Sequence, residues 1–205
     1  MGKEQHRFGS NVWTQEKLEA LKRYLEAYSL VMKNQPFSTG YIDAFAGTGK
    51  YTPRELEDDP DAFPDLFQED AEQFLDGSAS IALKVEPGFQ GFVFIEKDKK
   101  RLSELENLRR EHPDKNIQVK GGDCNEVIPR ICGAIKQDRK RRAVMFLDPY
   151  GMQVSWKTIC AVADTERVDL WILFPLGIGV NRLLRRDGKI PEAWKQRLDD
   201  IFGTT

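Results

Sequence analysis

The first regular pattern along the chain is helical. Apolar residues recur at intervals of three and four, at Leu18, Leu21, Leu25, Tyr28 and Met32. This spacing puts them on one face of a helix that would bury that face against other elements. Thr14 can cap the start of the helix, and Trp13 can pack against Leu18. We expect the helix to end near Asn34, before Pro36, and to lie against the first strand of a sheet.

Short apolar strands and helical segments then alternate along the chain. The predicted strands are 41–46, 91–95, 117–119, 143–147 and 168–174. The predicted helices are 79–85, 99–111, 126–136 and 156–163, and amphipathic segments follow at 180–186 and 191–202. This alternation is typical of a parallel sheet with helices on both faces. We expect an α/β fold, and a chain of 205 residues fits one domain.

One segment, residues 50–76, departs from this alternation. It contains three prolines and no clear periodicity, and its last 22 residues hold ten acids and no Lys or Arg. The whole chain has a net charge of −2, so the remainder carries +8. We interpret the segment as an acidic insert that forms a lid or a partner surface. A positive body with a basic run at 139–142 is compatible with nucleic acid.

The most informative chemistry follows the first predicted strand. Asp43 lies four residues before Gly47-Thr48-Gly49, where glycine permits a sharp turn and close approach of a ligand. The segment is not a phosphate-binding Walker A loop, which needs Gly at Ala44 and Ser or Thr at Tyr51. A third glycine, as in dinucleotide loops, is also missing. An acid below such a turn suits a cation, which points to S-adenosylmethionine (SAM).

Four predicted strands carry an acid at or near the carboxyl end: Asp43, Glu96, Asp123 and Asp148. Ligands of open parallel sheets bind outside these ends. Glu96 can accept from both ribose hydroxyls, and Asp123 can accept from an adenine amino group. Asp43 can attract the methionine ammonium or orient the turn. These roles together predict a nucleoside site at one edge of the sheet.

A second motif is Asp148-Pro149-Tyr150-Gly151. The carboxylate of Asp148 and the carbonyl of Pro149 can accept two N–H bonds, while the ring of Tyr150 stacks on a planar base. This combination favours a substrate whose base carries an exocyclic amine. A plain turn is the alternative, because Pro and Gly are common in turns.

Composition excludes several other chemistries. Cys124, Cys132 and Cys160 form no Cys-x-x-Cys pair, so a zinc site is not expected and the thiols should be reduced and buried. His6 and His112 are the only histidines, which argues against a histidine base or a His-rich metal site.

No apolar run reaches the ~18 residues of a membrane span, and the first residues lack a signal-peptide core. We therefore expect a cytoplasmic protein without membrane contact.

With these motifs in view, the chain resembles class I SAM-dependent methyltransferases. More closely, it resembles the three-Cys-motif partner protein (TcmP) family. The stretches that carry the resemblance are Trp13 to Leu25, Tyr41 to Gly47, Gly77-Ser78, Phe94 to Glu96, Gly122 to Asn125, Phe146 to Gly151 and Asp169 to Pro175. The resemblance implies a Rossmann-like, three-layer methyltransferase core, SAM as cofactor and a radical-SAM-like three-Cys-motif protein as partner. No further strand is evident after Phe174, so we expect either a truncated chain or a variant that lacks the usual edge hairpin.

Two sets of candidate site residues follow. The cofactor-binding set is Asp43, Phe45, Gly47, Gly49, Glu96, Lys97, Asp123 and Cys124, and the catalytic set is Asp148, Pro149 and Tyr150. The favoured function is methylation of an exocyclic amine on a nucleic-acid base. The motif is similar to the Asp-Pro-Phe-Gly of transfer-RNA guanine-N2 methyltransferases, and is one proline short of the Asp-Pro-Pro-Tyr of adenine-N6 enzymes. A non-catalytic partner or binding module, and methylation of a small molecule or protein, remain as alternatives.

Overall fold

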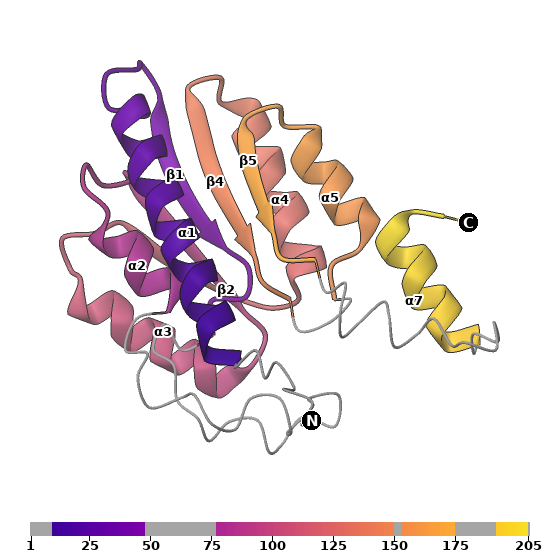
Figure 1. The fold of residues 1–205 in the computed structure, drawn as a ribbon. Coiled ribbons are helices and arrows are strands. Elements are labelled where there is room, and N and C mark those ends of the chain that lie inside the picture. Colours follow the sequence, from indigo (N-terminus) through magenta and orange to yellow (C-terminus); the bar gives the residue numbers. More distant parts are fainter. Residues whose placement is uncertain (1–9, 48–76, 150–152, 175–191, 205) are drawn as a thin grey trace, which may run out of the picture.

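The fold is built on five parallel strands, seen in a computed structural model that describes residues 10–47, 77–149, 153–174 and 192–204. The strands are β1 (Ser38–Asp43), β2 (Gly91–Glu96), β3 (Ile117–Gly121), β4 (Arg141–Leu147) and β5 (Val168–Ile172). The helices are α1 (Ser10–Met32), α2 (Ser78–Lys84), α3 (Lys99–Glu111), α4 (Cys124–Gln137), α5 (Trp156–Ala163) and α7 (Glu192–Phe202) (Figure 1).

The strands form one sheet in the order β3-β2-β1-β4-β5, with every described pairing parallel. Gly40 of β1 lies opposite Gly91 of β2 on one side and opposite Ala143 of β4 on the other. The chain therefore winds outward from β1 in one direction and then from β4 in the other. This reversal between β1 and β4 is the switch point at which ligands bind in such sheets.

Side chains alternate between the two faces of the sheet, so each face has its own core. One core joins α1, α2 and α3 to the sheet through side chains that include Leu21, Leu83, Leu105, Tyr41, Phe94 and Phe146. The other joins α4 and α5 to the opposite face through side chains that include Ile128, Cys132, Val162, Ile42, Ile95 and Met145. The predicted fold class, a Rossmann-like α/β sandwich of three layers, is confirmed (Figure 1).

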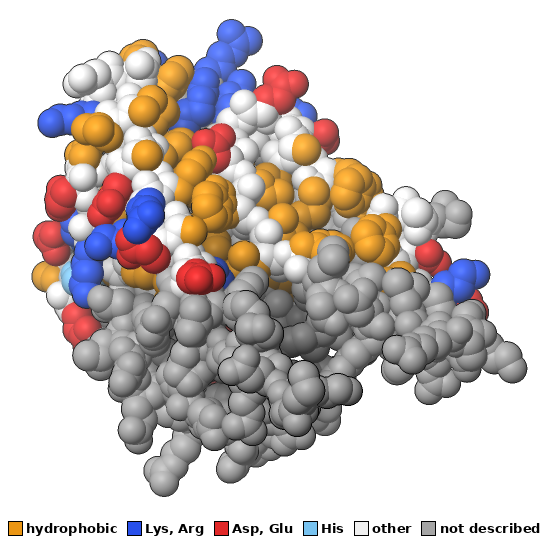
Figure 2. All heavy atoms as spheres, in the orientation of Figure 1, with side chains coloured by type: hydrophobic (Ala, Val, Ile, Leu, Met, Phe, Trp, Pro, Cys, Tyr) orange, Lys and Arg blue, Asp and Glu red, His pale blue; other side chains and the backbone are white. Residues whose placement is uncertain are grey.

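The sheet is covered unevenly. The residues of β5 are only partly buried, and Asp169 on this strand is exposed. Figure 2 shows apolar side chains gathered beside α1, over this part of the molecule. No strand within the described ranges pairs with the outer side of β5. The predicted lack of an edge hairpin also concerns residues 175–191, which lie outside those ranges.

Several predicted strand bounds are wrong. The strand predicted at 117–119 continues to Gly121, and the strand predicted at 143–147 begins at Arg141. The strand predicted at 41–46 begins earlier, at Ser38, and ends at Asp43. The reason is local: the backbone N–H of Phe45 donates to Asp43 Oδ1 at 3.2 Å, which turns the chain before Ala46. The last strand ends at Ile172, two residues early. Bounds predicted for the helices at 99–111 and 156–163 agree with α3 and α5.

The expectation that all three cysteines are buried is also wrong. Cys124 and Cys132 are buried, but Cys160 is exposed. Helix α5 buries Thr158 and Val162, which are one turn apart. Cys160 lies midway between them in sequence and therefore on the outward side of the helix.

Several predictions concern residues outside the described ranges. These are the acidic insert at 50–76, the segment at 180–186, and the site residues Gly49 and Tyr150. Within the described ranges, no helix is long and apolar enough to cross a membrane. No cluster of His, Cys, Asp or Glu suited to a metal ion occurs in that part of the chain either.

Candidate functional site

The four predicted acids lie along one edge of the sheet. Asp43 and Glu96 are the last residues of β1 and β2, Asp123 follows β3 by two residues, and Asp148 directly follows β4. The order β3-β2-β1-β4 makes their strands successive neighbours. The structure thus brings together four side chains that span more than 100 positions of sequence, with the switch point between Asp43 and Asp148.

Asp43 is fully buried beneath the turn. Its Oδ2 accepts from Ser78 Oγ at 2.5 Å and from the Tyr41 hydroxyl at 3.3 Å, and its Oδ1 accepts from the Phe45 amide. Burial raises the pKa of Asp43 to about 6, against the hydrogen bonds that lower it, and the nearby charge of Asp148 adds to the rise. A carboxylate with no exposed surface orients the turn rather than meeting a ligand. Of its two predicted roles, the structure favours the orienting one.

The turn after β1 leaves its last described glycine open to a ligand. Gly47 has φ of +60°, a left-handed conformation that favours glycine. No described atom lies within 4 Å of the position that a Cβ would take there. Ala46 N–H donates to the carbonyl of Ile95 at 3.4 Å, which ties the turn to β2. The turn therefore presents backbone beside the end of β2, where Glu96 lies.

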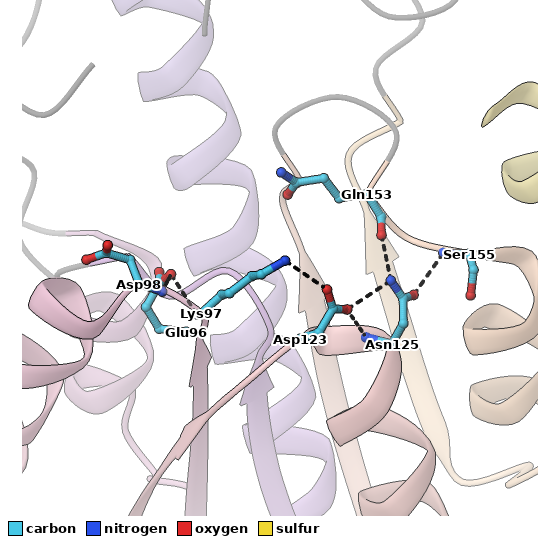
Figure 3. A network of polar contacts seen from close by, with 7 residues as sticks. All are labelled: Glu96, Lys97, Asp98, Asp123, Asn125, Gln153 and Ser155. Atoms are coloured by element: carbon cyan, nitrogen blue, oxygen red, sulfur yellow. Dashed lines mark hydrogen bonds and ion pairs between the residues drawn. The ribbon is translucent and has the colours of Figure 1, made fainter. Parts of the chain in front are cut away.

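Glu96 is held in a fixed orientation by the backbone that follows it. Its Oε1 accepts from the amides of Lys97 at 2.8 Å and Asp98 at 2.9 Å, and only 9% of the residue is exposed (Figure 3). Asp98 then caps α3 by accepting from the amides of Lys100 and Arg101. Among the described residues, no hydrogen bond reaches Glu96 Oε2. That oxygen is available to a ligand hydroxyl.

Asp123 has structural partners on both oxygens. Oδ1 accepts from the amide of Asn125 at 2.9 Å and caps α4, while Oδ2 lies 3.3 Å from Lys97 Nζ. Burial by itself raises the pKa of Asp123, but these hydrogen bonds and the Lys97 charge outweigh it and leave the pKa below its usual value. The Lys97 side chain is 77% exposed, so it can move aside. Asp123 Oδ2 could accept from an adenine amino group only if that group replaced Lys97 Nζ.

Cys124 follows Asp123 and begins α4, with its side chain in the core. Burial, with the adjacent Asp123 charge, raises the pKa of the thiol to about 12. The thiol therefore stays protonated and cannot act as a nucleophile. Any contact of Cys124 with a cofactor would come from its backbone.

Asn125 is a site residue that was not singled out for a role from the sequence. Its Oδ1 accepts from Ser155 N at 2.9 Å and Thr158 Oγ1 at 2.7 Å, and its Nδ2 donates to the carbonyl of Gln153 at 2.8 Å and to Asp123 Oδ1 at 3.1 Å. Figure 3 shows this side chain between the ends of α4 and α5. It fixes the chain that returns from the Asp148 motif.

Lys17 is the second residue that sequence reasoning missed. Its Nζ lies 2.5 Å from Asp148 Oδ2, and the two side chains are 14% and 34% exposed. A signal was present, because Lys17 shares a helical stripe with Leu21, Tyr24 and Tyr28. Tyr24 and Tyr28 belong to the face that packs on the sheet, and so does Lys17. The pair joins α1 to the end of β4.

Pro149, the next residue of the motif, is buried beside Asp148. Tyr150 and Gly151 lie outside the described residues, so the predicted stacking ring is untested. The described half of the motif supplies a carboxylate and a rigid, buried proline at the switch point. Fold and edge together define a Rossmann-like α/β protein with a candidate nucleoside site.

Comparison with known proteins does not assign this Rossmann-like α/β protein to a more specific class. No protein-family model and no curated protein matches the sequence. A solved structure described as "Putative methyltransferase yhhF from Escherichia coli" resembles the chain with 14% identity and a TM-score of 0.37. The match covers 73% of this chain and 63% of that one, which is less than two thirds of its length. So distant a likeness carries no argument about activity, and membership of the TcmP family stays a prediction.

Proposed function

We propose that this chain is a SAM-dependent methyltransferase core that acts on an exocyclic amine of a nucleic-acid base. One observation carries the proposal. The Oε2 atom of Glu96 has no partner among the described residues. Glu96 lies at the edge of the sheet that also carries the Gly47 turn and Asp148. This edge is where nucleoside ligands of such sheets bind.

The described residues fit SAM by their chemistry. Glu96 Oε2 would accept from the ribose hydroxyls, and the open backbone at Gly47 would admit the amino-acid portion. Asp123 would serve the adenine amino group once Lys97 moves. When bound, SAM supplies an electrophilic methyl group. The buried charge of Asp43, although it makes no direct contact, favours a cation nearby.

The chain's own residues would act by positioning. Asp148 would accept a hydrogen bond from the amine and keep the nitrogen lone pair aimed at the methyl group. The proton that the nitrogen loses would pass to the Asp148 carboxylate or to solvent. No covalent nucleophile is needed, which agrees with the raised pKa of the Cys124 thiol. Tyr150 would stack on the base.

A second candidate function has an observation of its own. Asp148 already pairs with Lys17 at 2.5 Å, so its carboxylate stabilises the packing of α1 on the sheet. This favours a non-catalytic module that binds SAM or a partner protein, such as the radical-SAM-like three-Cys-motif protein implied by the family resemblance. In that case Asp148 would be structural and no methyl transfer would occur.

Two measurements test the proposal. Calorimetry with SAM tests the cofactor, and transfer of labelled methyl from SAM to separate pools of RNA, DNA and protein tests the substrate. Label in RNA or DNA supports the proposed function. SAM binding without label in any pool supports the non-catalytic module. No SAM binding, with the folded protein verified by circular dichroism, would reject both the cofactor and the reaction.

A further inference from the structure

Basic side chains gather at the opposite edge of the sheet, where the strands begin. We call this set the amino-edge cluster; it consists of Lys136, Arg139, Lys140, Arg141, Arg142 and Arg167. Figure 2 shows blue side chains standing out at the end of the molecule farthest from the grey segments. The seven residues of β4 separate this edge from Asp148, which at 3.3 Å per residue is about 20 Å. The cluster is therefore remote from the candidate functional site.

The cluster extends across neighbouring strands. Arg141 lies opposite Ser38 of β1, and the amide of Ser38 donates to the carbonyl of Lys140 at 2.9 Å. On the other side, the amide of Ala143 donates to the carbonyl of Arg167 at 3.0 Å. Strands are about 4.8 Å apart. The cations from the α4–β4 and α5–β5 connections thus lie side by side along one edge.

The connection that carries most of the cluster is held in a fixed shape. Asp138 accepts from the Lys140 amide at 3.0 Å and from Arg141 Nε at 3.1 Å. The guanidinium of Arg142 lies 3.9 Å from the centre of the Phe37 ring and donates to the carbonyls of Arg139 at 2.9 Å and Arg141 at 2.7 Å. The single acid between residues 136 and 142 is therefore used to order the backbone. It does not neutralise the outermost cations.

Those outermost cations are the side chains of Arg139 and Lys140. Both residues are exposed, and no hydrogen bond or ion pair joins either side chain to another described residue. Asp164 and Glu166 are exposed in the neighbouring α5–β5 connection. The six cations of the cluster, counted with these two acids and Asp138, leave a net charge of +3 on the two connections. A solvated surface is the ordinary explanation of such a run. An ordered backbone that presents unpaired cations favours a ligand instead, because the ordering cost is already met.

We propose that the amino-edge cluster binds the phosphate backbone of a nucleic acid. Guanidinium groups match phosphate geometry, and adjacent cations release counterions when they meet a polyanion. This binding needs neither SAM nor Asp148 and is therefore separate from the proposed function. It has one consequence for that function: a substrate that reaches both edges must span about 20 Å, or roughly six nucleotides at 3.4 Å each.

The test uses the full chain without SAM and a labelled probe of about 20 nucleotides, as single-stranded RNA, duplex RNA or duplex DNA. Fluorescence anisotropy measures binding at about 50 mM and about 200 mM salt. Arg139→Gln/Lys140→Gln removes two cations from the cluster. The matched control, Lys22→Gln/Arg23→Gln, removes two exposed cations from the middle of α1. Both pairs are exposed, so the melting temperature of each variant should stay near that of the wild type.

We expect the cluster variant to bind at least one probe about tenfold more weakly. The slope of the logarithm of its affinity against the logarithm of salt concentration should become shallower by nearly two, because two fewer cations release counterions. The control should change affinity less than twofold. The proposal would be overturned if both variants weakened binding equally, or if polyglutamate competed with the probe as well as unlabelled nucleic acid does. Binding only to anionic lipid vesicles would also overturn it. If the double variant is unfolded, Lys140→Gln alone is compared with Lys22→Gln. Methyl transfer is not measured, so a failure of the proposed function leaves this result intact.

Discussion

Lys17 Nζ lies 2.5 Å from Asp148 Oδ2, across 131 positions of sequence. This ion pair joins the first described helix to the end of the fourth strand, at the switch point of the sheet. It gives Asp148 a role in the fold that the Asp-Pro-Tyr-Gly motif alone did not suggest. Any catalytic role of Asp148 must therefore be separated from its role in holding α1.

Lys17→Met should leave the part-buried Asp148 carboxylate without its cation. Exposed pairs contribute up to about 1 kcal/mol, and breaking a buried pair costs about 3–5 kcal/mol. For this intermediate pair, we expect a loss of about 1–2 kcal/mol in the free energy of unfolding, measured in urea. The double variant Lys17→Met/Asp148→Asn should recover part of it. Lys22→Met, an exposed change on the same helix, is the control, and an equal loss there would contradict a specific pair.

The buried Asp43 predicts a pH effect on stability. Burial raises its pKa from 3.8 to about 6, so the folded chain holds the proton where the unfolded chain releases it. The free energy of unfolding then falls as pH rises from about 4 to about 6, by roughly 3 kcal/mol for this group. It should be level above that range as far as Asp43 is concerned.

Asp43→Asn removes this titration and keeps an acceptor for the Phe45 amide. The difference in unfolding free energy between Asp43→Asn and the wild type, from urea titrations across this window, should therefore grow in favour of the variant as pH rises. A difference that does not change with pH would show that Asp43 titrates normally. Other acids cancel in the comparison, since both proteins contain them.

Glu96 gives a direct test of the ribose contact. Glu96→Ala should weaken SAM binding by about 1–3 kcal/mol, the loss expected for hydrogen bonds to a charged acceptor. Glu96→Gln can still accept from the amides of Lys97 and Asp98, but replaces the second oxygen with a donor. It should fold normally and still bind SAM weakly. Calorimetry with Glu104→Ala, an exposed residue of α3, as control would disprove the contact if all three variants bind alike.

We predict that removing the Asn125 side chain weakens the structure locally, at the ends of α4 and α5, rather than throughout the sheet. Asn125→Ala removes the acceptor for Ser155 N and Thr158 Oγ1 and the donor to the Gln153 carbonyl. We expect a loss of about 1–3 kcal/mol in stability. Hydrogen exchange at the Ser155 amide should accelerate more than exchange in β1. Uniform acceleration through the sheet would mean that Asn125 does not hold the α4 and α5 ends together.

The sequence allowed the layers and the edge of the site to be predicted, because hydrophobic periods report local structure. Parallel strands then bring their terminal acids to one edge without further information. The Asp123 cap was also within reach, since an acid three residues before Glu126 at the start of a helix is a capping signal. The burial of Asp43 was not, because it depends on Ser78 returning from 35 positions away. The helical stripe places Lys17 on the packing face of α1. Its pairing with Asp148 also depends on how α1 crosses the sheet, which no local pattern specifies.

The chemistry at Asp148 is decided by comparing two losses in the same preparations. If Asp148 orients the amine, Asp148→Asn should bind SAM normally and lose methyl transfer about a hundredfold or more, the scale of lost positioning at a reacting centre. Lys17→Met breaks the same ion pair but keeps the carboxylate, so it should lose similar stability and retain most of the transfer rate. Single-turnover rates on the substrate found in the labelling experiment, with melting temperatures for both variants, separate the two roles. A stable Asp148→Asn protein with wild-type turnover, or equal loss of rate in both variants, would assign Asp148 to the fold alone.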